Sequence, residues 1–414
     1  MKRLMIAGAS ILQLPAILRA KEKGLYVGVV DYDPEAIGIK YSDEYFNVST
    51  IDEKGVYEAA KFFRADGIMT LATDMPMRSV AYTCEQLGLP GISYNTAVKA
   101  TDKGEMIKAF DVAGVAHPWY YIVSNKDDFD YGRITFPCIS KPIDNSGSRG
   151  VMIANDEQEL HKALQWSFSK SRSGKIIIEE YMEGPEVSVE VIVLNSIPYI
   201  LQITDKLTTN APHFVEMGHN QPSMLSETNQ RQIKELASKA VLAVGITEGP
   251  AHVEMIVTSD GPKMVELGAR MGGDCITTHL IPLSTGIDMV GATIDLALGI
   301  VPNIEKKYDK GAAILFFDAP TGLIKEISGE KEAKSMPGVV EVSFTKREGM
   351  YHKGVSGGSG ERIGFVITQD ITAEKAVQLA EKVANTIVIK TDETCERPVC
   401  TPKKNSNMST VYTL

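Results

Sequence analysis

Two glutamates placed symmetrically about a turn are the residues of this sequence best suited to bind a cation. Glu254 and Glu266 each lie six positions from Asp260, within the segment HVEMIVTSDGPKMVELGARMGGD at residues 252–274. Apolar runs on both sides of an Asp-Gly turn are typical of a β-hairpin. A three-residue loop centred on Asp260 would place the two carboxylates opposite each other, with Cβ atoms roughly 5 Å apart.

Like charges at this separation destabilise a bare sheet, whereas a divalent cation between them reverses the sign of the interaction. Carboxylate oxygens suit Mg²⁺, and Mn²⁺ accepts the same ligands. Arg270 and the pair Gly272-Gly273 follow directly, and a cation site beside a guanidinium and a flexible backbone indicates phosphate chemistry. The alternative is an exposed hairpin with two solvated glutamates, because a register slip of one residue would separate the carboxylates.

Two further segments combine a lysine with backbone suited to an anion. Lys141 lies on a buried strand predicted for residues 137–142, directly before the loop NSGSRG at residues 145–150. Small residues let the backbone approach an anion closely, and consecutive N–H groups form a concave nest. In a helical segment predicted for residues 96–114, Asp102 and Glu105 resemble a capping box. Lys103 then falls in a first turn, where the helix dipole disfavours a cation and thereby hints at a task for it.

A polar segment at residues 206–223 is long enough to be a functional loop. It contains Lys206, His213, Glu216 and His219, which are side chains able to bind or deprotonate a substrate. The sequence therefore predicts a substrate-facing loop here.

Composition narrows the function classes. The chain has 414 residues, an apolar fraction of 43% and a net charge of -10 without a long basic run, which disfavours nucleic acid as a partner. Five scattered cysteines form no CxxC pair, so neither a disulfide framework nor a zinc site is indicated. No signal peptide and no apolar run of the ~20 residues that span a membrane are found. We therefore expect a cytoplasmic protein that has no membrane contact.

The chain is predicted to be an α/β protein that begins with an open parallel sheet. Strand-like and helix-like segments alternate over residues 2–100, which favours parallel strands. Gly8 after the first strand and Asp31 at the end of the second suggest a dinucleotide site, but that fingerprint needs three glycines and this loop has one. A plain doubly wound sheet is therefore preferred.

Taken together, these motifs resemble the ATP-grasp superfamily of carboxylate–amine ligases over about residues 1–390, most closely the bacterial L-amino acid ligases. The resemblance implies a domain with an open parallel sheet, then an ATP-grasp core of two sheets with a small lid, and a C-terminal α+β domain. The predicted units are residues 1–115 (the open-sheet domain), 116–186 (the small lid), 187–310 (the large subdomain with the metal site), 311–390 (the C-terminal domain) and 391–414 (a tail expected to be disordered).

The resemblance assigns the ATP contacts residue by residue. Lys103 would reach the α-phosphate, Lys141 would act beside the phosphate loop, and Glu186 would bind the ribose hydroxyls. The flexible loop over the β- and γ-phosphates contributes Ser146, Gly147, Ser148 and Gly150. The hinge consists of Glu179, Glu180, Tyr181 and Met182. The backbone of Glu180 and Met182 would contact the adenine.

The same resemblance assigns the chemistry. Glu254 and Glu266 would bind Mg²⁺, and Arg270 would steady the acyl phosphate and the tetrahedral intermediate. Glu216 and His219 would lie near the substrates with Gly272 and Gly273, and His219 is a candidate base, its alternative being a loop histidine bonded to backbone. Arg270, His219 and Lys141 are therefore the expected catalytic residues. The sequence departs from the family at Gly268, where the family often has an Asn ligand, which puts a second Mg²⁺ in doubt.

The reaction implied is ATP-dependent joining of a carboxylate to an amine through an acyl phosphate, with release of ADP and phosphate. The expected substrates are small molecules, most simply two amino acids that form a dipeptide. A purine-pathway or bicarbonate-activating ATP-grasp enzyme and a non-catalytic nucleotide-binding regulatory protein are the alternatives. A homodimer is expected by analogy alone.

Overall fold

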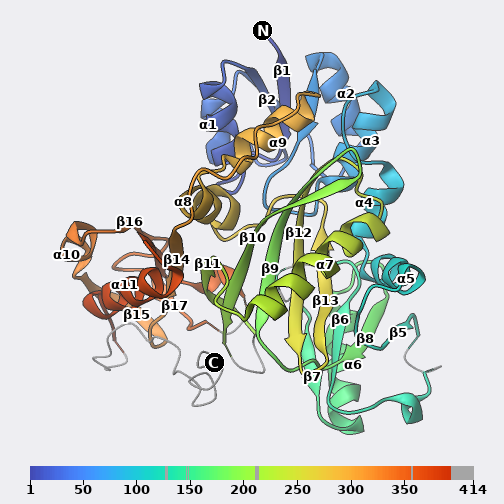
Figure 1. Ribbon diagram of the computed structural model, residues 1–414, viewed down its shortest axis with the longest axis vertical. Helices are drawn as coiled ribbons and strands as arrows, with labels where there is room; N and C mark the ends of the chain where they lie inside the picture. Colours follow the sequence, from blue (N-terminus) through green and yellow to red (C-terminus); the bar gives the residue numbers. More distant parts are fainter. Residues whose placement is uncertain (126–128, 146, 148, 210–213, 356–357, 393–414) are drawn as a thin grey trace.

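Four parallel strands form the N-terminal domain of the computed structural model, which describes residues 1–125, 129–145, 147, 149–209, 214–355 and 358–392 (Figure 1). The strand order is β3-β2-β1-β4, which confirms the predicted open parallel sheet. Alternate residues of β1 enter two separate apolar cores, so both faces of the sheet are covered. The elements are β1 Arg3–Ala7, α1 Leu14–Glu22, β2 Tyr26–Asp31, β3 Glu44–Asn47, α2 Glu53–Phe63, β4 Gly67–Met69 and α3 Met77–Leu87.

The helix predicted for residues 96–114 is two helices, α4 Tyr94–Thr101 and α5 Lys103–Ala113. The break lies at Asp102, whose extended backbone and side chain begin a new helix by accepting hydrogen bonds from the N–H groups of Gly104 and Glu105. The cap places Lys103 at the first position of α5.

The lid is an antiparallel sheet of order β5-β8-β6-β7, covered by one helix. It lies at the opposite end of the molecule from the N-terminal domain, with the large sheet between them (Figure 1). Its elements are β5 Tyr120–Val123, β6 Cys138–Pro142, β7 Met152–Ala154, α6 Glu157–Lys170 and β8 Ile176–Glu180.

The largest sheet has eight strands in the order β13-β12-β9-β10-β11-β14-β18-β16. It continues across the predicted boundary at residue 310, because β11 pairs antiparallel with β14 from Gly218↔Leu315 to Gln221↔Ala312. Its strands are β9 Glu186–Leu194, β10 Ile197–Thr208, β11 Glu216–Gln221, β12 Gly249–Thr258, β13 Gly261–Gly268, β14 Gly311–Phe317, β16 Val339–Phe344 and β18 Gly364–Asp370.

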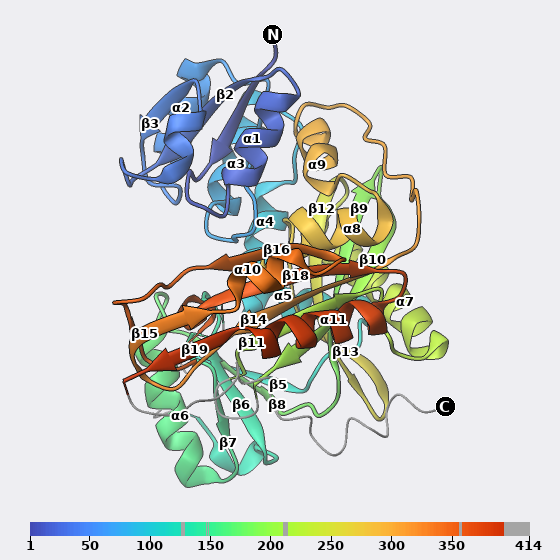
Figure 2. The same cartoon turned by 90° about the vertical axis from the view of Figure 1, so that its left-hand side faces the viewer.

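Helices cover this sheet along its length. Helix α11 lies against β14 and β18 at the C-terminal end of the sheet (Figure 2). No single helix among the described residues is long and apolar enough to cross a bilayer, although Ile276–Thr285 and Met289–Ala297, bent by 116°, pass that test as a pair. The helices are α7 Glu227–Ala243, a π-helix Ile276–Leu280, α8 Ile281–Thr285, α9 Met289–Ala297, α10 Glu330–Ser335 and α11 Ala373–Thr386.

A smaller sheet of order β17-β15-β19 completes the C-terminal region. Its strands are β15 Gly322–Ser328, β17 Tyr351–His352 and β19 Val388–Thr391. Thr391, the first residue of the predicted tail, is therefore the last residue of a strand, and residues 393–414 lie outside the described residues.

The prediction of a long loop at residues 206–223 is wrong. Strand β10 extends to Thr208, and β11 pairs with it through Asp205↔Asn220 and Lys206↔His219. Polar composition suggested a loop, but the side chains of Lys206 and His219 are buried and form ion pairs or hydrogen bonds within the protein. His213 lies outside the described residues.

Candidate active site

The predicted pairing of Glu254 with Glu266 across a hairpin is confirmed, although the turn differs from the expected one, and metal binding by this pair stays a prediction. Glu254 and Glu266 are direct cross-strand partners in the β12–β13 hairpin. The loop has two residues, Ser259 and Asp260, and not three. A register shift beside Glu254 leaves Val265 without an opposite residue, and this bulge restores the pairing that the shorter loop would remove.

Cations of the protein itself already hold Glu254. Its Oε2 lies 2.9 Å from Lys206 Nζ and its Oε1 lies 3.2 Å from His252 Nε2. Burial alone would raise the pKa of Glu254, but Lys206 and His252 outweigh it and hold the pKa well below its usual range. The carboxylate is therefore ionised, and a metal ion bound to it would share it with Lys206 and His252.

Lys103 holds the second glutamate. Its Nζ lies 2.7 Å from Glu266 Oε2 and donates to the Asn145 carbonyl at 2.8 Å, so the first turn of α5 reaches both the hairpin and the phosphate loop. Burial opposes the charged amine, yet Glu266, Asp74 and Glu179 outweigh burial and raise the pKa of Lys103. The predicted nucleotide lysine thus faces the predicted metal carboxylates.

Arg270 is bound to the N-terminal domain. Its Nη2 lies 2.8 Å from Oδ2 of Asp74, which lies five residues after β4. Burial disfavours the guanidinium charge, but Asp74, Glu254 and Glu266 raise the pKa of Arg270 further. The glycine at position 268 makes this pair sterically feasible, because a Cβ there would lie 2.6 Å from Asp74 Oδ1 and 2.9 Å from Arg270 Cζ.

Lys206 links Glu254, a predicted metal ligand, to Glu216, a predicted substrate contact at what is called the substrate end below. Its buried Nζ lies 2.8 Å from Glu216 Oε1 and 3.8 Å from Glu186 Oε2, besides its contact with Glu254. Burial opposes the amine's charge, but the three carboxylates hold the pKa of Lys206 well above its usual value. For Glu186 burial prevails, and its pKa is raised although Lys206 opposes this.

The lid contributes a buried ion pair and the hinge. Lys141 Nζ lies 2.6 Å from Glu179 Oε2, with both side chains more than nine-tenths buried. The next residue, Glu180, pairs with Lys263 at 2.9 Å, which ties the hinge to β13. Tyr181 and Met182 follow the end of β8.

The phosphate loop is described in part. Gly147 and Gly150 have φ angles of +66° and +89°, which glycine adopts without strain. Ser146 and Ser148, predicted to contact the phosphates, lie outside the described residues.

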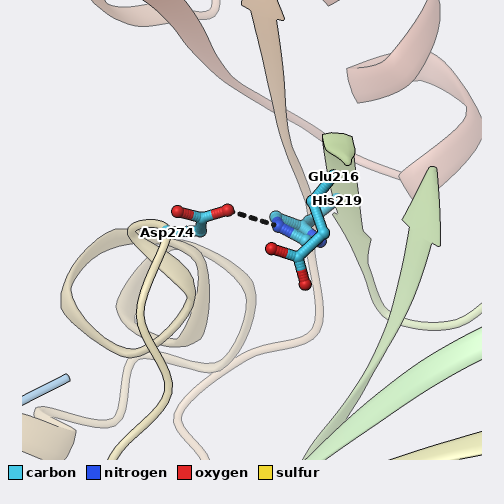
Figure 3. A group of neighbouring side chains, drawn as sticks. All are labelled: Glu216, His219 and Asp274. Atoms are coloured by element: carbon cyan, nitrogen blue, oxygen red, sulfur yellow. Dashed lines mark hydrogen bonds and ion pairs between the residues drawn. The ribbon is translucent and has the colours of Figure 1, made fainter. Parts of the chain in front are cut away.

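Near the substrate end, His219 Nε2 lies 3.3 Å from Asp274 Oδ2, and the Glu216 carboxylate lies beside them (Figure 3). One ligand atom from each of these three residues lies within 4.8 Å of the others, which is the spacing of a cation site. Arg362 and Lys206 already form ion pairs with Asp274 and Glu216, however, so their positive charges oppose a metal ion here.

Sequence reasoning missed a buried pair that supports the metal carboxylate. Glu190 Oε1 hydrogen-bonds to His252 Nδ1, and Glu190 Oε2 accepts the Gly272 N–H at 3.2 Å. Burial disfavours the imidazolium, but Glu190 and Glu254 outweigh burial and raise the pKa of His252 to about 9. A Cβ at Gly272 would lie 2.6 Å from His252 Nδ1, so this approach needs glycine. Residues 272–275, which include the predicted substrate contacts Gly272 and Gly273, are called the substrate loop below.

Asp74 and Arg362 were also missed. Asp74 carries a detectable signal, since ligands of open α/β sheets bind outside the carboxyl ends of the strands and Asp74 follows such an end. Arg362 carries none, because its contacts are with residues 88 and 146 positions away.

Comparisons with known proteins identify the domains that contain most of these residues. The family model of the ATP-grasp domain matches residues 134–278, and that of the L-amino acid ligase C-terminal domain 2 matches residues 315–392. The chain belongs to the ATP-grasp superfamily of carboxylate–amine ligases.

Individual relatives of this ATP-grasp ligase are distant. Alanine–anticapsin ligase of Bacillus subtilis (strain 168) is 26% identical over 70% of the chain and 66% of its own length. Carnosine synthase 1 of Homo sapiens is 21% identical over 73% of the chain and only 40% of its own length. The crystal structure of L-amino acid ligase from Bacillus licheniformis shares the fold, with a TM-score of 0.82 at 22% identity over 95% of this chain and 99% of that one.

Proposed function

We propose that this ATP-grasp ligase joins two amino acids into a dipeptide. The observation that carries the proposal is the facing pair Glu254–Glu266. Lys103 of α5 pairs with Glu266, and Arg270 lies near enough for both glutamates to raise its pKa. The C-terminal match to the L-amino acid ligase domain supports an amino acid as substrate over other carboxylates.

The donor set fits the divalent cation that this family uses with ATP. Glu254 and Glu266 are hard oxygen ligands, both ionic partners of cationic side chains, and would hold Mg²⁺ or Mn²⁺. The bound ion would neutralise phosphate charge and so assist attack of the first substrate's carboxylate on the γ-phosphate.

The protein's own residues supply position and charge. Lys103 and Lys141 meet the phosphates, and Arg270 stabilises the acyl phosphate and the oxyanion of the tetrahedral intermediate. The backbone of Glu180 and Met182 and the carboxylate of Glu186 bind the nucleoside. Closure of the loop at residues 145–150 would exclude water, which otherwise hydrolyses the anhydride.

The amine of the second amino acid then attacks the acyl phosphate, and phosphate leaves. Glu216, His219 and the backbone of Gly272 and Gly273 form the end of the site that receives this amine. Before it attacks, the ammonium group of the second amino acid transfers a proton to His219, which acts as the base.

The test is a screen of amino-acid pairs for ATP-dependent phosphate release, with the product identified by mass spectrometry. Phosphate and dipeptide formed in equal amounts are expected for at least one pair. A parallel series contains bicarbonate or ribosylated amines in place of amino acids. Turnover in that series alone would replace the proposal with a purine or bicarbonate activity, and no ADP formation in either series would indicate a non-catalytic nucleotide-binding protein.

A further inference from the structure

One side chain of the C-terminal domain reaches the candidate active site. The guanidinium of Arg362, two residues before β18, makes a bidentate pair with Asp274, with Nη1–Oδ2 and Nη2–Oδ1 distances of 2.7 Å. Nη1 also donates to the Glu216 carbonyl at 3.2 Å, and the guanidinium carbon lies 3.6 Å above the Phe316 ring. Arg362 therefore holds β11, the substrate loop and its own domain together.

The residue that Arg362 clamps has a strained backbone. Asp274 and the next residue, Cys275, have φ angles of +48° and +62°, in the left-handed region that residues other than glycine rarely adopt. Such conformations cost about 1 kcal/mol or more each and persist only where the surroundings impose them. The bidentate pair with Arg362 is the strongest such restraint on Asp274, since charge-assisted forked bonds fix both distance and orientation.

Asp274 in turn orients His219. An ionised carboxylate only accepts hydrogen bonds, and Asp274 remains ionised because Arg362 and His219 hold its pKa far below the usual range against the effect of burial. The hydrogen between Asp274 Oδ2 and His219 Nε2 therefore belongs to the histidine. His219 Nδ1 is buried and has no hydrogen-bond partner among the described residues, so no group there would accept a hydrogen from it, and the neutral imidazole carries its one hydrogen at Nε2.

We propose that Asp274 and Arg362 are positioning residues through which the C-terminal domain fixes His219 as the Nε2–H tautomer and holds the substrate loop in place. The tautomer follows from the contacts alone. The consequence for the amine substrate rests on the proposed function, since it requires that this end of the site receives the amine.

Histidine NMR tests the tautomer without any turnover. The full chain is labelled with ¹³C,¹⁵N-histidine, and His219 is assigned by the loss of its signals in His219→Gln; the other six of the seven histidines report whether each variant is folded. The native protein is expected to show His219 protonated at Nε2. In Asp274→Asn, Arg362 would attract the amide oxygen and turn the amide NH₂ toward His219, so the hydrogen is expected to move to Nδ1.

Arg362 is tested by a graded pair of substitutions. Arg362→Lys keeps the charge but loses the bidentate fork, and Arg362→Met loses both, so the KM for the amine substrate should rise several-fold in the first and more than tenfold in the second. The KM for ATP should change less than twofold. Arg347→Met removes an exposed arginine of the same domain that pairs with Glu330 and lies over the Phe344 ring; it is the matched control and should change neither constant.

The outcomes separate the two proposals. An Nδ1–H tautomer in the native protein, or a His219 signal unchanged by Asp274→Asn in a folded protein, overturns the positioning role. Equal effects of Arg362→Met on both KM values would also overturn it, because they would show a general loss of structure. A native Nε2–H tautomer that flips in Asp274→Asn, in a protein that ligates no amino acids, supports the positioning role and rejects the dipeptide function.

Discussion

Asp74 Oδ2 lies 2.8 Å from Arg270 Nη2, and this contact joins the N-terminal domain to the arginine that we propose stabilises the reaction. The two residues are 196 positions apart, and each has one buried polar atom, Asp74 Oδ1 and Arg270 Nε, without a hydrogen-bond partner in the described part of the chain. The orientation of the guanidinium therefore depends on the packing of one domain against another.

Substitution of this pair should impair turnover to different degrees. Arg270→Ala should lower kcat about 10²- to 10³-fold, which is the usual loss when a donor to a developing oxyanion is removed. Asp74→Asn keeps the shape but loses the charge, so a smaller decrease is expected. Steady-state kinetics measure both, with the exposed Glu235→Gln as a control. Near-native turnover of Arg270→Ala would remove Arg270 from the mechanism.

Gly268→Asn would introduce the side chain that the family often has at this position, and it should harm this protein. Its Cβ would lie 2.6 Å from Asp74 Oδ1, so the new side chain would displace Asp74 from Arg270. A lower kcat is expected, and the double variant Gly268→Asn/Asp74→Gly should lose less than the sum of the two single losses, because both changes remove the same Asp74–Arg270 contact. A double-mutant cycle on kcat/KM gives the coupling. Strictly additive losses would show that Asp74 does not occupy this space.

Lys206→Met should make the protein depend on a divalent cation for stability. Without the amine, Glu216 and Glu254 repel each other in a buried environment, so the metal-free variant should have a lower Tm than the native protein. Mg²⁺ should then raise the Tm of the variant more than that of the native protein, because binding to the folded state alone stabilises it. Thermal melting in EDTA and in Mg²⁺ measures this.

The exposed Lys239→Met on helix α7 is the matched control for that experiment and should behave like the native protein. Equal Mg²⁺ shifts in Lys206→Met and in the control would mean that Lys206 and the cation do not share Glu254.

His252 should make stability fall at alkaline pH. Its pKa is about 9 in the folded chain and about 6.5 unfolded, so the folded state binds the proton more tightly. The resulting stabilisation, on the order of 3 kcal/mol as an upper bound, is fully present below pH 6.5 and is lost as the pH rises through 9. Chemical denaturation of the metal-free protein between pH 6 and 10 measures it. His252→Gln should flatten this decline, and the exposed His161→Gln should not.

The pairing of Glu254 with Glu266 could be predicted from the sequence, but the way in which the hairpin achieves it could not. Symmetry about Asp260 correctly paired Glu254 with Glu266, although the hairpin reaches that pairing through a two-residue loop and a bulge. The shorter loop and the bulge each shift the register by one residue, in opposite directions, so their effects cancel. Local patterns identify a hairpin, whereas a bulge depends on contacts with the neighbouring strand, here β9.

The partners of the site residues could not be found in the same way. Strand and helix signals predicted the open N-terminal sheet and the helical segment at residues 96–114, although not its break at Asp102, because these signals depend on residues close in sequence. Glu190, Asp74 and Arg362 act on residues 62, 196 and 88 positions away, and no local spacing relates them. The polar segment around Lys206 was interpreted as a loop for the same reason, since its burial depends on carboxylates from other strands.

The continuous pairing of β11 with β14 has a practical consequence for dissecting this enzyme. A fragment that stops near residue 310 would retain the ATP-grasp core but expose the bare edge of β11, with its N–H and C=O groups free to recruit another chain. Such a truncation would promote aggregation through this edge, and it would also remove Arg362. Chimeras that exchange substrate specificity between related ligases would therefore do better to graft individual loops onto the intact sheet than to swap whole C-terminal halves.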